Sequence, residues 1–301
     1  MDRFSALQLF IRVVDCGSFT HAARELGLGQ PAVSKQVAAL EAHLGTSLLK
    51  RTSRGLQPTA AGQDLYAAAV RLLGDLEETE SRILRGSGSP TGRVRVAIPP
   101  AMGPLYITPR LPAFLARFPH LAVELSVSER HVDLVQEGID VALRVGALHD
   151  SSWLVRRIGS LRASTVATPE YLARQGTPAH PAELRRHALV SVRLQGALLP
   201  WKFKGQDGVF SLEPAGRITV NDSENVRAAV LAGLGIGHDS TALFEADLRA
   251  GKVVRILTDF APDPVPIQAV CAVGRRMPQR VRVFVEFLAD LCAAEPSLRL
   301  E

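Results

Sequence analysis

The chain has 301 residues, of which 47% are hydrophobic, 22% charged and 5% aromatic, and 35 lysines and arginines stand against 30 aspartates and glutamates. These proportions exclude collagen-like, rod-like and disordered chains, and at about 150 residues per domain the length predicts two domains. No apolar run approaches the roughly 20 residues of a membrane span, and the first residues lack the pattern of a secretory signal, so we expect a cytoplasmic chain without membrane contact.

The first predicted elements are helices. Apolar spacing predicts a helix over residues 6–14 whose inner face carries Leu7, Phe10, Ile11 and Val14. Ser18 is a good N-cap for a second, short helix that ends near Gly27. The apolar positions of that helix are Phe19, Ala22, Ala23 and Leu26.

A third helix follows a tight glycine-containing turn, which makes the pair a helix-turn-helix candidate. Pro31 suits its first position, and Gly45 is a natural stop after it. Its inner positions recur at intervals of four, three and four residues: Val33, Val37, Leu40 and Leu44.

The opposite face of the third helix is small, polar and basic. If the apolar positions face inward, the outward residues are Gln30, Pro31, Ser34, Lys35 and Ala38. Such a face suits the major groove, where Gln pairs with adenine, Lys with guanine, and Ser with a base or a phosphate. The alternative is an ordinary solvated helix face.

The next stretch favours contact with DNA. Residues 47–52 and 56–59 are predicted to be short strands of a β-hairpin wing around residues 53–55. Within residues 30–57, Lys35, Lys50, Arg51 and Arg54 stand against Glu41 alone, a local net charge of +3. Contacts to phosphates supply most non-specific affinity for DNA, so this located charge means more than the balance of the whole chain.

A long helix is predicted over residues 60–85, capped by Thr59. At 1.5 Å per residue it spans roughly 39 Å, and its narrow apolar stripe carries Leu65, Leu72, Leu76 and Ile83. A small N-terminal domain cannot cover such a stripe, so we expect this helix to pair with a second copy of the chain. The alternative is a monomeric connector packed within one chain.

Residues 86–92 (GSGSPTG) are predicted to be a linker, with a domain boundary near residue 90. After it, strands at 93–98, 121–127 and 139–145 alternate with helices around 111–118 and at 131–137. This order predicts a mainly parallel sheet with right-handed crossovers. We expect a second lobe to begin near residue 164, a return to the first lobe around 266–270, and a last helix over 278–292.

Ligands of open α/β sheets bind beyond the carboxyl ends of strands. That rule selects Pro100, Ala101, Met102, Gly103, Ser128, Glu129, Arg193 and residues 144–146, which begin with Arg144. Asn221 and Ser223 are added as polar residues where a strand end meets a helix start, and His238 is added as a nearby group. Because Arg144, Arg193 and His238 carry or can gain positive charge, we predict a small organic anion as ligand. The alternatives are that Arg144 pairs with a structural acid and that Asn221 or Asp222 only caps a helix.

Several motifs resemble the LysR-type transcriptional regulators. They are residues 19–26 (FTHAAREL), 30–37 (QPAVSKQV), 40–41, 44–45, 48–49, 51 and 58–62, and, less sharply, 140–146 and 233–237. The resemblance implies a winged helix-turn-helix, a dimerising linker helix and a two-lobed domain similar to type 2 periplasmic binding proteins. It also implies a homotetramer that binds promoter DNA and a small-molecule effector in the cleft between the lobes. The DNA-contacting positions it implies are Gln30, Pro31, Ser34, Lys35 and Gln36, with Arg51 and Arg54 in the wing. His238 departs from the family, which more often has a small or apolar residue there.

Other chemistry finds no support in the residues. Residues 233–237 (GLGIG) lack the strand and the downstream acid of a dinucleotide site. His238, Asp239 and Ser240 are the residue types of a catalytic triad, but being adjacent in sequence does not give them the geometry of a triad. Cys16, Cys271 and Cys292 are too far apart for a Cys-only zinc site. We therefore predict no enzyme activity, no metal and no cofactor.

The predicted organisation is a DNA-binding domain at 1–59, a linker and dimerisation helix at 60–90, and an effector-binding domain at 91–301. The effector-binding domain divides into one lobe at 91–163 and 267–301 and another at 164–266. The predicted function is a sequence-specific transcription regulator modulated by a metabolite. The alternative is a cytoplasmic small-molecule binding protein or enzyme with an N-terminal interaction module.

Overall fold

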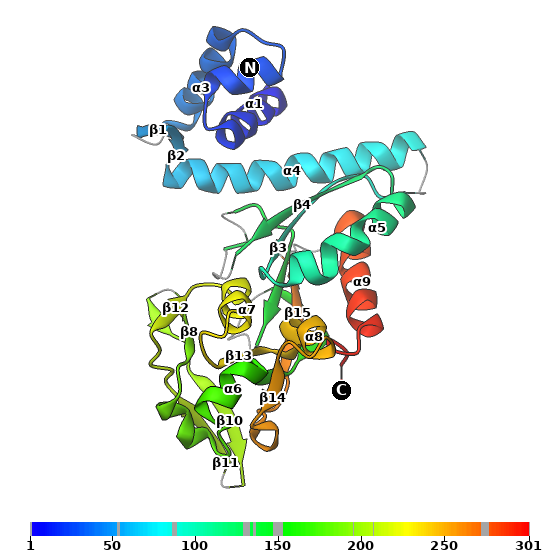
Figure 1. The fold of residues 1–301 in the computed structure, drawn as a ribbon. Helices are drawn as coiled ribbons and strands as arrows, with labels where there is room; N and C mark the ends of the chain where they lie inside the picture. Colours follow the sequence, from blue (N-terminus) through cyan, green and yellow to red (C-terminus); the bar gives the residue numbers. More distant parts are fainter. Residues whose placement is uncertain are drawn as a thin grey trace.

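The structure is a computed structural model that describes residues 2–52, 55–85, 89–128, 133–134, 137–146, 153–194, 196–206, 208–271 and 277–300. Figure 1 shows the arrangement of its parts: an N-terminal head, a long helix α4 (Ala60–Arg85), and a larger α/β part on the other side of α4. Among the helices of the described segments, none combines the length and apolar character needed to cross a membrane.

The head consists of α1 (Arg3–Cys16), α2 (Phe19–Glu25), α3 (Gln30–Leu44) and the hairpin of β1 (Leu49–Thr52) and β2 (Gly55–Pro58). The predicted helices and hairpin are confirmed. The Ser18 side chain caps α2 by accepting from the His21 N–H, and α3 ends at Gly45, whose φ of +68° is the left-handed conformation that glycine adopts easily.

Two details of the predicted head core are wrong. In α1 the buried residues are Ala6, Leu9, Phe10 and Val13, so Phe10 lies in the core as predicted. Leu7 and Val14 are half-buried and pack against the core, and Ile11 is half-buried. Apolar residues cover a broad arc of α1, and packing against neighbouring helices selects a stripe about one residue away from the predicted one. Leu44 is 44% exposed because the last turn of α3 extends beyond the head core.

Helix α4 has the predicted limits and the predicted cap. The Thr59 hydroxyl donates to the Ser47 carbonyl at 2.7 Å and accepts from the Gly62 N–H at 3.1 Å, which ties the start of the helix to the segment before the wing. Three apolar side chains of α4 are exposed to solvent: Leu72 at 49%, Leu76 at 36% and Ile83 at 74%.

The first lobe is built on a sheet with the strand order β4-β3-β5-β15-β6. Its strands are β3 (Gly92–Ile98), β4 (Leu121–Val127), β5 (Val141–Val145), β6 (Leu154–Leu161) and β15 (Val265–Cys271). Strand β3 pairs in parallel with β4 and β5, as predicted, but β15 runs antiparallel to both β5 and β6. The sheet is mixed because the chain returns from the second lobe in the opposite direction.

Helices α5 (Leu111–Arg117) and α9 (Gln279–Ala294) cover the first-lobe sheet. Helix α5 follows the short helices η1 (Gly103–Ile107) and η2 (Thr108–Arg110), and its Phe114 meets Phe284 of α9 edge-on at 5.4 Å. The helix predicted at 131–137 is not confirmed: residues 133, 134 and 137 lie in coil and turn, and the others lie outside the described residues. Glu129 and residues 86–88 of the predicted linker lie outside them too.

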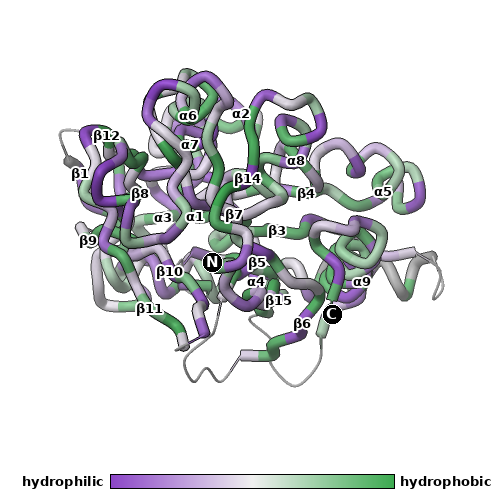
Figure 2. Tube along the Cα trace, turned by 60° about the horizontal axis from the view of Figure 1, so that its bottom comes forward, coloured by the Kyte–Doolittle hydropathy of each residue, from purple (hydrophilic) through white to green (hydrophobic). Residues whose placement is uncertain are grey.

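The second lobe carries the sheets β13-β7-β14 and β12-β8-β9 and the hairpin β10-β11. The strands are β7 (Ala163–Ala167), β8 (Val190–Leu194), β9 (Ala197–Leu198), β10 (Trp201–Gly205), β11 (Gly208–Leu212), β12 (Ile218–Val220), β13 (Gly237–Ser240) and β14 (Val254–Ile256). The helices are α6 (Pro169–Gln175), η3 (Pro181–Arg186), α7 (Ser223–Leu231), α8 (Thr241–Arg249) and η4 (Thr258–Phe260). Hydrophobic residues concentrate in inner strands such as β3 and β7, and polar residues on the outer turns (Figure 2).

Candidate functional sites

The first candidate site is the exposed side of α3. Gln30, Pro31 and Lys35 are exposed, and Ser34 and Gln36 are half-buried, while Val33, Val37 and Leu40 fill the head core. Helix α3 begins after Gly29, which has no side chain to cap the free N–H groups. The positive end of the helix therefore lies beside Gln30 and Lys35, where it favours an anion such as a phosphate.

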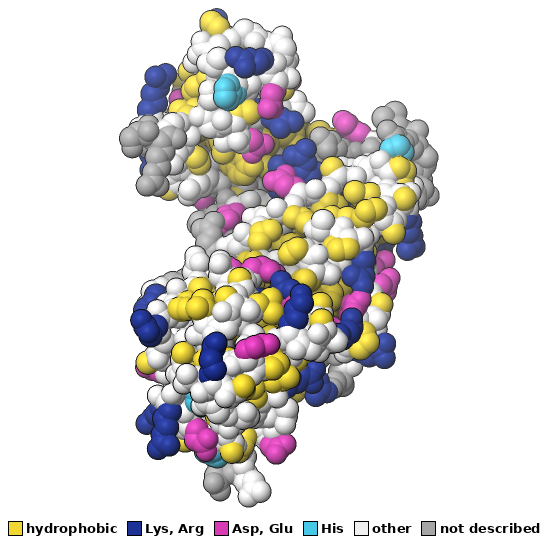
Figure 3. All heavy atoms as spheres, viewed as in Figure 1, with side chains coloured by type: hydrophobic (Ala, Val, Ile, Leu, Met, Phe, Trp, Pro, Cys, Tyr) yellow, Lys and Arg dark blue, Asp and Glu magenta, His cyan; other side chains and the backbone are white. Residues whose placement is uncertain are grey.

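The wing lies next to α3. Lys50 and Arg51 of β1 are exposed, and Arg54 lies outside the described residues. In Figure 3, Lys and Arg side chains lie at the edge of the head where α3 and the hairpin lie in Figure 1, and others lie elsewhere on the head. One oxygen of the Glu41 carboxylate accepts from the N–H groups of Leu48 and Leu49, at 2.7 and 3.2 Å. Glu41 thus fixes the wing to α3, a role that its charge alone did not reveal.

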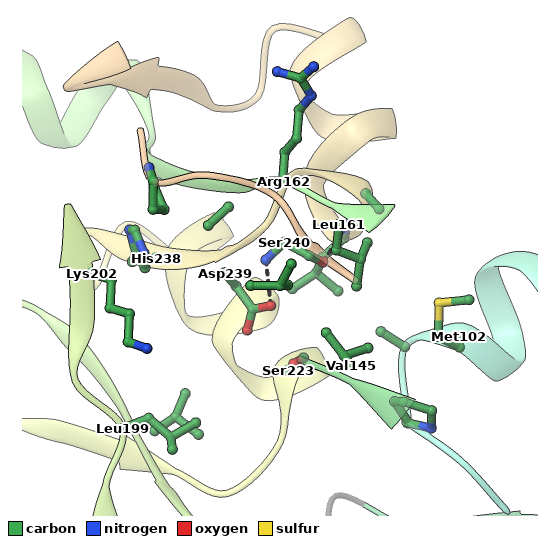
Figure 4. A pocket seen from close by; sticks show the side chains of 18 of the residues that line it. Met102, Val145, Leu161, Arg162, Leu199, Lys202, Ser223, His238, Asp239 and Ser240 are labelled. Atoms are coloured by element: carbon green, nitrogen blue, oxygen red, sulfur yellow. Dashed lines mark hydrogen bonds between the residues drawn. The ribbon is translucent and has the colours of Figure 1, made fainter. Parts of the chain in front are cut away.

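The second candidate site is a cavity of about 490 Å³ between the two lobes. It lies where the chain crosses between them, near Arg162 and Pro262. Predicted ligand-binding residues that the structure brings together on its wall are Ala101, Met102, Ser128, Arg144, Ser223 and His238. Figure 4 shows Met102 and Val145 on one side and Lys202 and His238 on the other.

The other predicted ligand-binding residues that the structure describes do not line this cavity. On β8, Val192 and Leu194 face it, so strand alternation turns Arg193 away, and its guanidinium donates to the Gly196 carbonyl at 2.9 Å. Gly103 is buried against Ile98. Pro100 lies between Pro99 and Ala101, which both line the cavity, but is not itself part of the wall. Asn221 is exposed just before Asp222, the N-cap of α7.

His238 lies in the wall as a neutral aromatic group. Its ring stacks on Trp201 with centroids 5.3 Å apart and planes 21° apart, and its Nδ1 lies 2.9 Å from the Thr165 hydroxyl. Burial lowers the pKa of His238 to about 4. At neutral pH this ring therefore carries no positive charge, and its contact with a ligand stays a prediction.

Sequence reasoning missed polar residues of the second lobe. Lys202 of β10 points into the space in front of Asp239 (Figure 4). Asp239 accepts from the Ser240 N–H at 2.6 Å, and burial raises the pKa of its carboxyl. The alternation of buried Trp201 and Phe203 with Lys202 predicts a strand, but the packing of Trp201 on His238 of β13 is a long-range contact that brings β10 to the cavity.

The charges of the cavity come from both lobes. Arg144 of β5 belongs to the first lobe, and burial lowers the pKa of its guanidinium. Lys202 belongs to the second lobe. The carboxylate of Asp263, at the rim of the cavity, pairs with Lys204, whose Nζ lies 2.6 Å from Oδ1. Arg162 and Asp239 add one group of each charge type, and the remaining wall is largely apolar, with Met102, Leu105, Leu161, Leu199 and Leu243. This arrangement suits an anionic group attached to an apolar body.

Comparison with known proteins gives matches over both parts of the chain. Residues 4–63 match the family described as "Bacterial regulatory helix-turn-helix protein, lysR family", and residues 87–293 match the "LysR substrate binding domain". The HTH-type transcriptional regulator YhjC of Escherichia coli K12 is 36% identical over 293 residues, which cover 97% of this chain and 98% of that protein.

Solved structures agree with these matches. CrgA, a LysR-type transcriptional regulator from Neisseria meningitidis, has a TM-score of 0.63 at 32% identity, over 95% of this chain and 97% of that chain. The full-length virulence activator AphB of Vibrio cholerae has a TM-score of 0.63 at 29% identity, over 96% and 99%. The predicted fold class, a winged helix-turn-helix followed by a two-lobed α/β domain, is confirmed.

Proposed function

The chain belongs to the LysR family of transcriptional regulators, and from this premise we propose that a small metabolite in the interlobe cavity modulates its binding to promoter DNA. Similar proteins are named as transcriptional regulators, and the chain is a regulator and not an enzyme. The alternative of an enzyme with an N-terminal interaction module is therefore set aside. A regulator acts where the chromosome lies, so we infer a cytoplasmic location.

The DNA-reading surface that we propose is the exposed N-terminal part of α3 together with the wing. The observation that supports it is the exposure of Gln30, Pro31 and Lys35 beside the exposed basic residues of β1. Ser34, Gln36 and Arg54 complete the proposed contacts. Lys35 reads bases and Arg51 contacts phosphate in this proposal.

Two substitutions test this division of roles. Lys35→Ala is expected to reduce the preference for the upstream intergenic DNA of its own gene over random DNA. Arg51→Ala is expected to weaken binding to all DNA alike and to lower the slope of log affinity against log salt by about one. Equal effects of the two substitutions in a fluorescence anisotropy titration would contradict the proposal.

The effector that we propose is a small organic anion with an apolar body. Arg144 and Lys202, from opposite lobes, support it, because one anion between them would draw the lobes together. Calorimetric titration with aliphatic and aromatic carboxylates and their uncharged amides tests the proposal. Binding of the carboxylates alone is expected, and binding of the amides alone would overturn it.

We further propose a homodimer through α4, extended to a homotetramer. The exposed stripe of Leu72, Leu76 and Ile83 supports the pairing of α4 with a second copy. Leu76→Glu is expected to produce monomers in sedimentation analysis, and an unchanged oligomer would refute the role of this stripe. The domain limits predicted from the sequence, 1–59, 60–90 and 91–301, are part of the same proposal.

A further inference from the structure

Helix α4 packs one of its faces on the first lobe of its own chain. Tyr66, Val70 and Gly74 recur every four residues and therefore lie on one face of the helix. The backbone of Gly138, at a φ of +63°, approaches that face closely: a Cβ there would lie 3.6 Å from Tyr66 Cε1 and 3.7 Å from Val70 Cγ1. The loop at Gly138 therefore lies within van der Waals reach of this face of α4.

Arg280 of α9 reaches the same face of α4 from inside the first lobe. The residue is 3% exposed, and its Nη1 donates to the Gly74 carbonyl at 3.1 Å. Its Nη2 lies 3.5 Å from Asp75 Oδ1. A Cβ at Gly74 would lie 2.9 Å from Nη2, so a side chain at that position would force the end of Arg280 to shift.

Asp140 connects Arg280 to the first-lobe sheet. One oxygen of its carboxylate accepts from the Arg95 N–H of β3 at 2.9 Å, and the other lies 3.9 Å from Arg280 Nη2. Burying a guanidinium is costly unless its partners are in place, and two of these partners belong to α4. The charge of Arg280 is therefore best satisfied while α4 stays docked.

The docked face of α4 also touches the head. The Tyr66 hydroxyl lies 2.5 Å from Asp15 Oδ1 of α1, so one residue of α4 contacts both the head and the first lobe. The exposed stripe of Leu72, Leu76 and Ile83 lies on another side of the helix, since successive residues are about 100° apart. Docking within the chain thus leaves the stripe free for a second copy.

We propose that Arg280 is a latch that holds α4 on the first lobe of its own chain, and that this latch transmits the state of the lobes to the head. The transmitting role rests on the proposed function. The latch itself does not, because it can be measured without DNA or effector.

A disulfide reports whether the latch is closed. A Cβ at Gly138 would lie 3.9 Å from Val70 Cβ, within the span of about 3.5–4.5 Å that a disulfide bridges. A side chain at position 138 is strained by the left-handed backbone there, so Gly138→Cys alone is first compared with the unchanged chain by thermal melting. In a folded Val70→Cys/Gly138→Cys variant we expect an intramolecular disulfide to form under mild oxidation. Val70→Cys alone controls for pairing with Cys16, the half-buried native cysteine. A disulfide that forms only between chains would overturn the proposal.

Variants of the latch then change the rate of this reaction. Losing charge-assisted hydrogen bonds in Arg280→Met is expected to slow disulfide formation about tenfold. Arg282→Met, at an exposed position on α9, is the matched control and should change nothing. Gly74→Ala favours the helix but crowds Arg280, so it should slow the reaction in a chain that stays folded. An unchanged rate in both Arg280→Met and Gly74→Ala would overturn the latch.

The transmitting role is tested by footprinting the upstream DNA with the double-cysteine variant, once with its disulfide formed and once with the disulfide reduced. We expect footprints of different length, and identical footprints would overturn the transmitting role. If neither state gives a footprint, the proposed function and the transmitting role both fall, while the rates of disulfide formation still decide the latch.

Discussion

Removing the carboxylate of Glu41 is predicted to weaken DNA binding, although the loss of its negative charge alone would predict the opposite. Glu41 is the one acidic residue within residues 30–57, and its carboxylate accepts from the N–H groups of Leu48 and Leu49 where the wing begins. A hydrogen bond to a charged group contributes about 1.5–3 kcal/mol. Glu41→Ala removes both bonds, and because the second is long at 3.2 Å we expect a loss of about 3 kcal/mol in the unfolding free energy of the head. For a domain of this size the loss lowers the melting temperature by roughly 12 °C or more.

Glu41→Gln is the matched control, because it removes the same charge and keeps an oxygen that accepts a hydrogen bond. If charge alone mattered, both variants would bind DNA more tightly than the unchanged chain, and equally so. We expect Glu41→Ala to bind its upstream DNA about tenfold more weakly than Glu41→Gln, because the wing loses its anchor. Fluorescence anisotropy at fixed salt measures the difference. Equally tightened binding by the two variants would refute the anchoring role.

Other predictions concern the α/β part. Asp247 is 3% exposed at its side chain and accepts two bonds from Arg227, so Arg227→Met should cost about 3–5 kcal/mol in urea unfolding. Lys202→Met should weaken carboxylate binding about tenfold by calorimetry, whereas Arg193→Met, which faces away from the cavity, should not. The pKa of His238 falls from 6.5 to about 4 on folding, so the unfolded chain takes up the proton first and stability is lost as pH falls from 6.5 to 4, by about 3 kcal/mol in all. His238→Phe should remove this part of the pH dependence of the unfolding free energy. If the free energy of unfolding depends on pH in the same way in this variant, the buried ring is not the source of that dependence.

The elements that sequence reasoning predicted correctly depend on local chemistry. The cap of Thr59 on Gly62 and the left-handed Gly45 involve residues at most a few positions apart. The buried face of α1 and the exposure of Leu44 depend instead on neighbours from distant parts of the chain. The helix expected at 131–137 was suggested by alternation with strands, and its described residues follow coil and turn instead.

The residues of the candidate cavity also divide into those predicted from local sequence patterns and those that depend on long-range packing. Arg144 and Ser223 were found because each lies where a strand ends, at the carboxyl edge of the sheet of its own lobe. Arg193 was misplaced because one step along β8 reverses the side that a residue faces. Lys202 was missed because its strand reaches the cavity only through long-range packing of the β10-β11 hairpin.

The affinity for DNA of defined sequence tests the proposed regulator most directly. Anisotropy titrations compare the upstream intergenic DNA of its own gene with scrambled DNA of equal length, at several salt concentrations. We expect a preference of at least about a thousandfold for the upstream DNA, with affinity that falls steadily as salt rises. Equal affinity for the two DNAs at every salt concentration would contradict sequence-specific regulation by this chain.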